Sequence, residues 1–149
     1  MSVGQYCDQE IGLVSQDSSI LEAAQIMRNC HVGEVVVVEQ HNGKNIPVGI
    51  ITDRDLVIEI IAMEVDMGQI SVGSIMSLEM ITVNEDKSLR DTLEIMQLNG
   101  VRRSPVVDGS GALIGIIKIE DILEVLSLDM AKVLALFNTE RRIETSLRT

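Results

Sequence analysis

The strongest constraint on the fold is an internal repeat. The Val-Gly pair at Val3 recurs at Val72, and eleven residues between Val3 and Val38 are identical at this offset of 69 positions. After a longer first-copy loop the offset becomes 66, and Gly-Ile-Ile at Gly49 matches Gly-Ile-Ile at Gly115. Self-similarity of this kind indicates a tandem duplication. It divides the chain into three parts: repeat 1 (3–67), repeat 2 (69–128) and a C-terminal extension (129–149) that we expect to be helical.

Both copies predict the same order of secondary structure, β-α-β-β-α. A short strand (12–14 or 80–83) precedes a helix whose apolar residues share one face, with Asp17 or Asp86 expected as N-cap. The helix should end near Asn29 in the first copy and near Gly100 in the second. Two further strands (35–38 and 49–51; 105–107 and 115–117) are joined by a turn and lead into a final helix. The sequence therefore predicts an α+β fold of two such units.

Each unit has an apolar sheet face that it cannot bury by itself. We therefore expect the two repeats to pack sheet against sheet about a pseudo-twofold axis. A cleft with two nearly equivalent mouths would then lie between them.

Residues 49–56 combine several groups that bind anions or sugars. A β-branched strand changes there into a helix, whose first turn offers unpaired N–H groups and a partial positive charge. Thr52 adds a hydroxyl and Arg54 a charged fork, whereas Asp55 is an acceptor suited to a ribose diol. The same Thr-x-x-Asp pattern also fits a capping box that binds nothing. Both interpretations stay open at this point.

Composition narrows the function further. A formal net charge of -11 argues against a general nucleic-acid binder, and no apolar run is long enough to cross a membrane. Without a signal peptide, we expect a soluble, cytoplasmic protein. Tyr6 and Phe137 are the aromatic residues, so a bound base would pack on aliphatic side chains. Cys7 and Cys30 are too few for a disulfide framework and fit small buried hydrophobes.

The repeat resembles the tandem CBS domain, the regulatory pair named after cystathionine beta-synthase and also called a Bateman module. Two motifs carry the resemblance: Gly-x-x-Thr-x-x-Asp at 49–55 and x-x-Pro-Val-Val-Asp at 103–108. Both occur in register inside the predicted β-α-β-β-α unit, and the likeness covers residues 3–128.

The resemblance implies an adenosine compound in the cleft: AMP, ADP, ATP or S-adenosylmethionine. In that family each site draws on both repeats. Asp55 would hold the ribose, Thr52, Arg54 and Arg103 would face the phosphate, and Val83 and Val101 would flank the adenine. A second, weaker site would use Val14, Val32, Lys118 and Asp121.

The second site departs from the family pattern. Lys118 replaces the motif threonine, Glu34 stands where repeat 2 has Arg103, and Val36 replaces Pro105. Because a carboxylate repels phosphate, we expect the first site to bind more tightly.

We find no catalytic or metal-binding constellation, and we expect neither an enzyme nor a required cofactor. Cys30 and His31 are adjacent and lack a second ligand pair.

From Leu126 an apolar stripe continues at helical spacing to Phe137, followed by a polar end that we expect to be solvated or frayed. The stripe either folds back on the module or pairs with a second copy. We therefore expect a stand-alone, homodimeric sensor. The alternative is a structural or adaptor dimer that docks on an unidentified protein through this helix.

Overall fold

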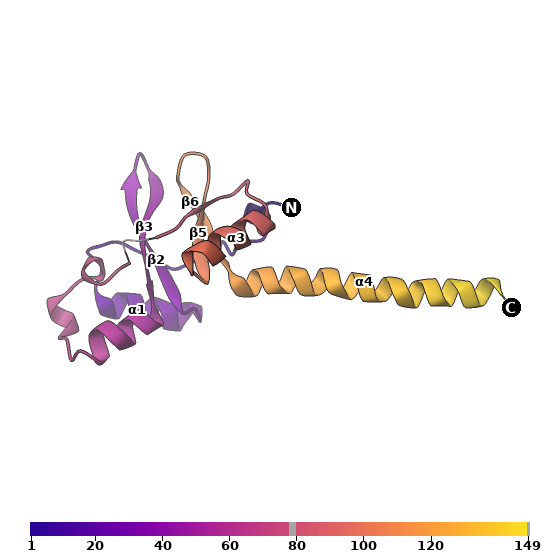
Figure 1. Ribbon diagram of the computed structural model, residues 1–149. Coiled ribbons are helices and arrows are strands. Elements are labelled where there is room, and N and C mark those ends of the chain that lie inside the picture. Colours follow the sequence, from indigo (N-terminus) through magenta and orange to yellow (C-terminus); the bar gives the residue numbers. More distant parts are fainter. Residues whose placement is uncertain (78–79, 149) are drawn as a thin grey trace.

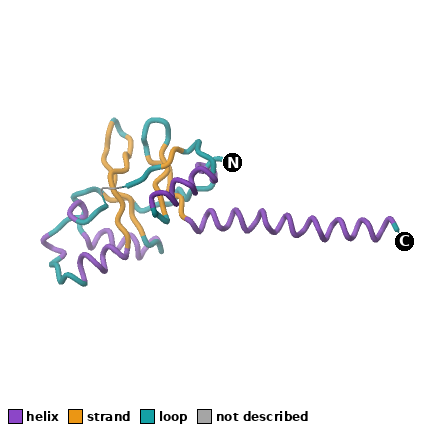
Figure 2. Tube along the Cα trace, in the orientation of Figure 1, coloured by secondary structure: helices purple, strands orange, loops and turns teal. Residues whose placement is uncertain are grey.

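The computed structural model describes residues 1–77 and 80–148, in which the strands form two three-stranded sheets (Figures 1 and 2). In the first sheet β1 (Leu13–Val14) runs parallel to β2 (Glu34–His41), which pairs antiparallel with β3 (Lys44–Thr52). In the second sheet β4 (Val83–Asn84), β5 (Arg103–Val107) and β6 (Leu113–Lys118) repeat this pattern. The predicted α+β fold of two β-α-β-β-α repeats is confirmed.

The helix of each repeat begins two residues later than the sequence suggested. Helices α1 (Ile20–Cys30) and α3 (Leu89–Asn99) are capped by Ser19 and Ser88 rather than by Asp17 and Asp86. Each serine hydroxyl accepts a backbone N–H at 3.0 Å. The prediction was wrong because a turn separates each short strand from its helix, which places the aspartate ahead of the first helical turn. The C-caps follow the prediction closely, with His31 and Gly100 left-handed.

The third strand of each repeat leads directly into helical structure. After β3 comes α2 (Asp53–Asp55), continued by η2 (Leu56–Ile61), a π-helical stretch. After β6 comes α4 (Ile119–Leu147), a single helix of 29 residues that projects away from the sheets (Figure 1). Repeat 2 and its extension share this one helix. Residues 119–147 contain no glycine or proline that would interrupt the helix. The polar end is helical as far as Leu147 and solvent-exposed.

The leading segment of each repeat packs on the other repeat. Val3, in the 3-10 turn η1 (Val3–Gln5), is fully buried in the core of repeat 2. Val72, in η4 (Val72–Ser74), is buried in the core of repeat 1, after the short turn η3 (Met67–Gln69). Four bridges tie these segments down in two equivalent pairs: Ser2 to Ser88 with Ser71 to Ser19, and Asp8 to Ile116 with Ser77 to Ile50. The two repeats are thus interlocked rather than merely docked.

The paired bridges reflect the pseudo-twofold relation between the repeats. Val36 and Val38 of repeat 1 share a core cluster with Ile116 of repeat 2, and Ile50, the counterpart of Ile116, packs against it. The predicted packing of sheet on sheet is therefore present. Within residues 1–77 and 80–148, none of the helices has both the length and the apolar sequence that a membrane span requires.

Candidate functional site

A cleft of about 310 Å³ lies between the two repeats, at the end of β3. Ligand pockets begin at about 300 Å³, so the cleft has room for one small molecule. Its walls come from both repeats. The apolar residues along it are Ile50, Met80, Ile81, Val101 and Pro105, and the polar ones are Thr52, Asp53, Arg54, Ser77, Arg102 and Arg103.

The cleft is cationic although the chain is acidic. Arg54, Arg102 and Arg103 line it together with one carboxylate, that of Asp53. Of the lining residues described, three are therefore positive and one negative, against a net charge of -11 for the chain. Such a local cluster attracts an anionic group while the protein as a whole repels polyanions.

The corner at Thr52 has the geometry of a capping box. The Thr52 N–H donates to Asp55 Oδ2 at 2.8 Å, and the Asp55 N–H donates to Thr52 Oγ1 at 3.2 Å. The capping interpretation of this pattern is confirmed, but it does not exclude a ligand. Thr52 and Arg54 line the cleft, whereas Asp55 is partly buried and is not among the lining residues.

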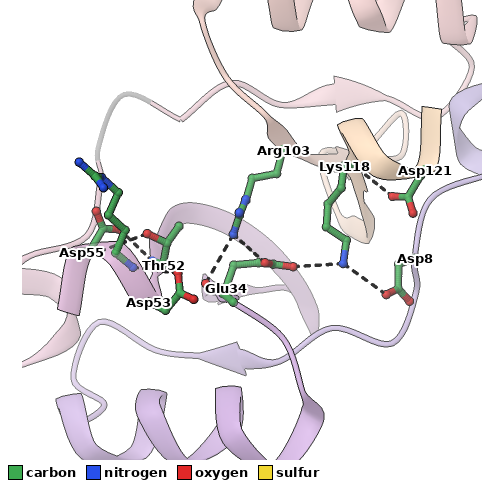
Figure 3. A network of polar contacts seen from close by, with 10 residues as sticks. Asp8, Glu34, Thr52, Asp53, Asp55, Arg103, Lys118 and Asp121 are labelled. Atoms are coloured by element: carbon green, nitrogen blue, oxygen red, sulfur yellow. Dashed lines mark hydrogen bonds and ion pairs between the residues drawn. The ribbon is translucent and has the colours of Figure 1, made fainter. Parts of the chain in front are cut away.

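Arg103 reaches across the repeat boundary to a buried carboxylate (Figure 3). Its Nη1 lies 2.7 Å from Glu34 Oε2 and 3.5 Å from the Gly33 carbonyl oxygen. Glu34 is 5% exposed, and its other oxygen lies 3.5 Å from Lys118 Nζ. Lys118 also lies 4.0 Å from Asp8 Oδ2. A carboxylate of repeat 1 therefore sits between two cations of repeat 2.

Two of the predicted apolar contacts lie elsewhere. Val83 and Val14 are 1% and 4% exposed and belong to the cores of their own repeats. Ile81 lines the cleft instead, and its carbonyl accepts the hydroxyl of buried Ser104 at 2.5 Å. Each short parallel strand turns its valine inward, so neither side chain lines the cleft, and their contact with a base stays a prediction. Val101 lines the cleft as expected.

The second-site residues do not form an equivalent cationic cleft. Lys118 is engaged with Glu34, and its backbone N–H donates to Asp121 Oδ2 at 2.9 Å, which repeats the cap at Thr52. Val32 is partly exposed after the end of α1. At the repeat offsets, the counterparts of Arg54, Arg102 and Arg103 are Glu120, Gly33 and Glu34. The three arginines are thus a property of the first cleft.

Sequence reasoning missed part of this wall. Arg102, Met80, Ile81 and Ile50 line the cleft but were not among the predicted site residues. Comparing the two repeats could have indicated Arg102, because repeat 1 has Gly33 at the counterpart position and the arginine is therefore specific to repeat 2. The contact between Arg103 and Glu34 was also foreseeable, because counterparts near a twofold axis lie close together.

Comparison with known proteins decides the family. The sequence of the CBS domain family matches this chain at residues 3–62 and 72–128, which is most of its length. The chain belongs to the CBS domain family. Its relatives include protein MK0525 of Methanopyrus kandleri, 38% identical over 84% of this chain, and the CBS domain-containing protein YhcV of Bacillus subtilis, 36% identical over 76% of both chains. This chain spans 62% of the length of MK0525.

Solved CBS structures share the architecture. A putative signal-transduction protein with CBS domains from Burkholderia ambifaria superposes with a TM-score of 0.74 at 25% identity, covering 87% of this chain and 96% of its own. The CBS domain pair of protein MJ0100 was solved with 5-methylthioadenosine and S-adenosyl-L-methionine. It also superposes with a TM-score of 0.74 at 25% identity, and the match covers 87% of this chain and 98% of that chain. The chain thus shares the fold of a CBS domain pair.

The similarity to an enzyme is confined to a small part of that enzyme. The inosine-5'-monophosphate dehydrogenase of Methanocaldococcus jannaschii is 31% identical over 116 residues, which is 22% of its length. Among residues 1–77 and 80–148, no three His, Cys, Asp or Glu side chains are grouped as metal ligands.

Proposed function

We propose that the cleft at Thr52 binds an adenosine compound and that the protein is a regulatory CBS pair. The observation that carries the proposal is the cationic cleft itself: it joins both repeats, has aliphatic walls and gathers three arginines in an acidic chain. The MJ0100 pair, solved with two adenosyl ligands, supports the ligand class.

The wall composition suggests how such a ligand is oriented. The base packs between aliphatic side chains from both repeats, such as Ile50, Ile81 and Val101, without a stacking aromatic. A phosphate, if the ligand has one, faces Arg54, Arg102 and Arg103 because guanidinium groups bind phosphate oxygens in pairs. Asp55 follows Arg54 directly and uses Oδ2 for the cap, so we assign its other oxygen, Oδ1, to the ribose.

The regulatory role follows from where the ligand sits. A molecule held by both repeats shifts the balance between two arrangements of the repeats by its difference in affinity for them. Binding at this cleft is therefore suited to changing the position of β3 relative to β5. Because β5 pairs with β6, and β6 leads into α4, the position of α4 would change as well.

A thermal-shift screen tests the ligand class. AMP, ADP, ATP, adenosine and S-adenosylmethionine are compared with GMP as control. Ligands that bind the folded state raise the melting temperature in proportion to the logarithm of their excess over the dissociation constant. Stabilisation by adenosine compounds and not by GMP supports the proposal. An equal response to GMP, or no response to any of them at millimolar concentration, contradicts it.

The exposed face of α4 favours a second proposal, that the module forms a homodimer through this helix. Leu126, Met130, Val133 and Phe137 are between 52% and 66% exposed and share one side. Residues 119–133 carry four acidic and one basic side chain (net -3), and residues 134–148 carry three basic and two acidic (net +1). Two copies of α4 packed antiparallel place unlike halves side by side and cover both apolar faces.

Light scattering coupled to size-exclusion chromatography tests the dimer. Val133→Asp places a carboxylate at the middle of the apolar face, and Ala131→Asp places the same group on another side of α4. We expect wild type and Ala131→Asp to be dimers and Val133→Asp to be a monomer with unchanged circular dichroism. A monomeric wild type, or a dimer that survives Val133→Asp, contradicts this pairing.

A further inference from the structure

The buried carboxylate of Glu34 contacts Arg103, one of the three arginines that line the cleft. Arg103 lines the cleft with Arg54 and Arg102, yet its Nη1 already has a carboxylate oxygen at 2.7 Å. Glu34 is 5% exposed and belongs to the other repeat. A charged group in such a position must stay paired, because an isolated buried carboxylate is strongly disfavoured.

Lys118 gives Glu34 a second partner. Its Nζ lies 3.5 Å from Glu34 Oε1, on the side away from Arg103, and its side chain is 23% exposed (Figure 3). Arg103 and Lys118 are themselves neighbours, paired across β5 and β6. Glu34 can therefore lose Arg103 to another anion and still have a cation beside it.

We propose that Glu34 is an internal competitor for the phosphate of the ligand. A phosphate entering the cleft takes over Arg103, and Lys118 keeps the released carboxylate compensated. The arrangement lowers the affinity for phosphorylated adenosine compounds relative to adenosine itself. This inference rests on the proposed function, because it describes how the same cleft selects among adenosine compounds.

The network also couples the two halves of the module. Glu34 and Arg103 are counterparts in the two repeats, as are Thr52 and Lys118. Two phosphates, one drawing on Arg103 and one on Lys118, would leave Glu34 buried without a cation. The module therefore takes one phosphorylated ligand per chain.

Calorimetry with AMP and adenosine tests the competition, with the ratio of their dissociation constants as the readout. Glu34→Gln keeps the size of the side chain and removes its charge. We expect AMP to bind about tenfold more tightly and adenosine as before, a gain of about 1.4 kcal/mol in AMP binding alone. Glu39→Gln is the matched control, because it removes one carboxylate from the exposed end of the same strand.

Lys118→Met provides the opposite perturbation. Without Lys118, Glu34 depends on Arg103, so AMP must compete harder and its affinity falls while that of adenosine is unchanged. A purely structural role for Lys118 would not alter this ratio. The variant also carries the test if Glu34→Gln fails to fold.

The outcomes separate the two proposals. If wild type binds adenosine and AMP but Glu34→Gln and Lys118→Met leave the ratio unchanged or move it the other way, the competitor role is wrong and the adenosine site stands. Two AMP molecules bound per wild-type chain also overturn it. If no adenosine compound binds any of the proteins, the proposed function fails and the inference fails with it.

Discussion

Replacing Gly115 by alanine tests whether the interlocked leading segments hold the module together. A Cβ at Gly115 would lie 2.6 Å from both the Asp8 carbonyl oxygen and Cys7 Sγ. Ordinary contacts begin at 3.4 Å, so the backbone of Asp8 must retreat by about 0.8 Å, the difference between these distances. That movement disrupts two hydrogen bonds of 2.9 Å between Asp8 and Ile116.

The expected loss of stability can be estimated from these contacts. Two hydrogen bonds contribute about 1 kcal/mol each, and crowding a packed site costs about 1–3 kcal/mol. Replacing glycine returns about 0.4–1 kcal/mol through the unfolded chain. We expect a net destabilisation of about 2–5 kcal/mol, measured by urea unfolding with circular dichroism. For a chain of this size the melting temperature falls by about 2–4 °C per kcal/mol.

Gly109→Ala is the matched control, because an added Cβ there meets no described atom within 4 Å. It should be neutral or stabilising by up to about 1 kcal/mol. If Gly115→Ala proves as stable as Gly109→Ala, the leading segment does not hold repeat 2 in the way described.

Three further outcomes are expected. Asp55→Asn keeps an acceptor for the capping hydrogen bond, so it should change stability by less than about 0.5 kcal/mol and weaken adenosine binding in calorimetry; equal binding would remove Asp55 from the site. Partial burial raises the pKa of the Cys7 thiol, whereas Cys30 is exposed. Iodoacetamide at neutral pH should therefore label Cys30 before Cys7, as followed by mass spectrometry. The reverse order would contradict the packing of the leading segment. Hydrogen bonds from the Ser110 hydroxyl and N–H hold the pKa of Asp108 below its ordinary value. The ionised carboxylate therefore stabilises the turn above the pKa of the unfolded chain, and this stabilisation is lost as the pH falls through the pKa of the folded protein. An NMR titration of Asp108 should show the low midpoint, and Ser110→Ala should raise that midpoint.

The architecture could be predicted from the sequence because each element occurs in both repeats, so each prediction can be checked against its counterpart. Strands, turns and helix ends agree between copies, and left-handed residues such as Asn42, Gly43 and Gly100 fall where turns or caps were expected. Helix starts were less predictable, since aspartate and serine are both good caps and only the intervening turn decides between Asp17 and Ser19.

The site was predicted in part, for a physical reason. Motif residues such as Thr52 and Arg103 reach the cleft because the ends of β3 and β5 place them there. Val14 and Val83 alternate with neighbours on two-residue strands, where the pattern is too short to assign a face. The exchange of leading segments left no local signal, because an apolar Val3 looks the same whichever repeat covers it.

The most direct test of an adenosine site in the first cleft is a calorimetric titration of two matched variants with AMP. Val101→Trp fills the cleft between the repeats, and Val32→Trp makes the same change at the counterpart position of repeat 1. We expect wild type and Val32→Trp to bind AMP and Val101→Trp to have lost binding while keeping its fold. Unaltered binding by Val101→Trp, or a loss confined to Val32→Trp, would contradict this assignment of the site.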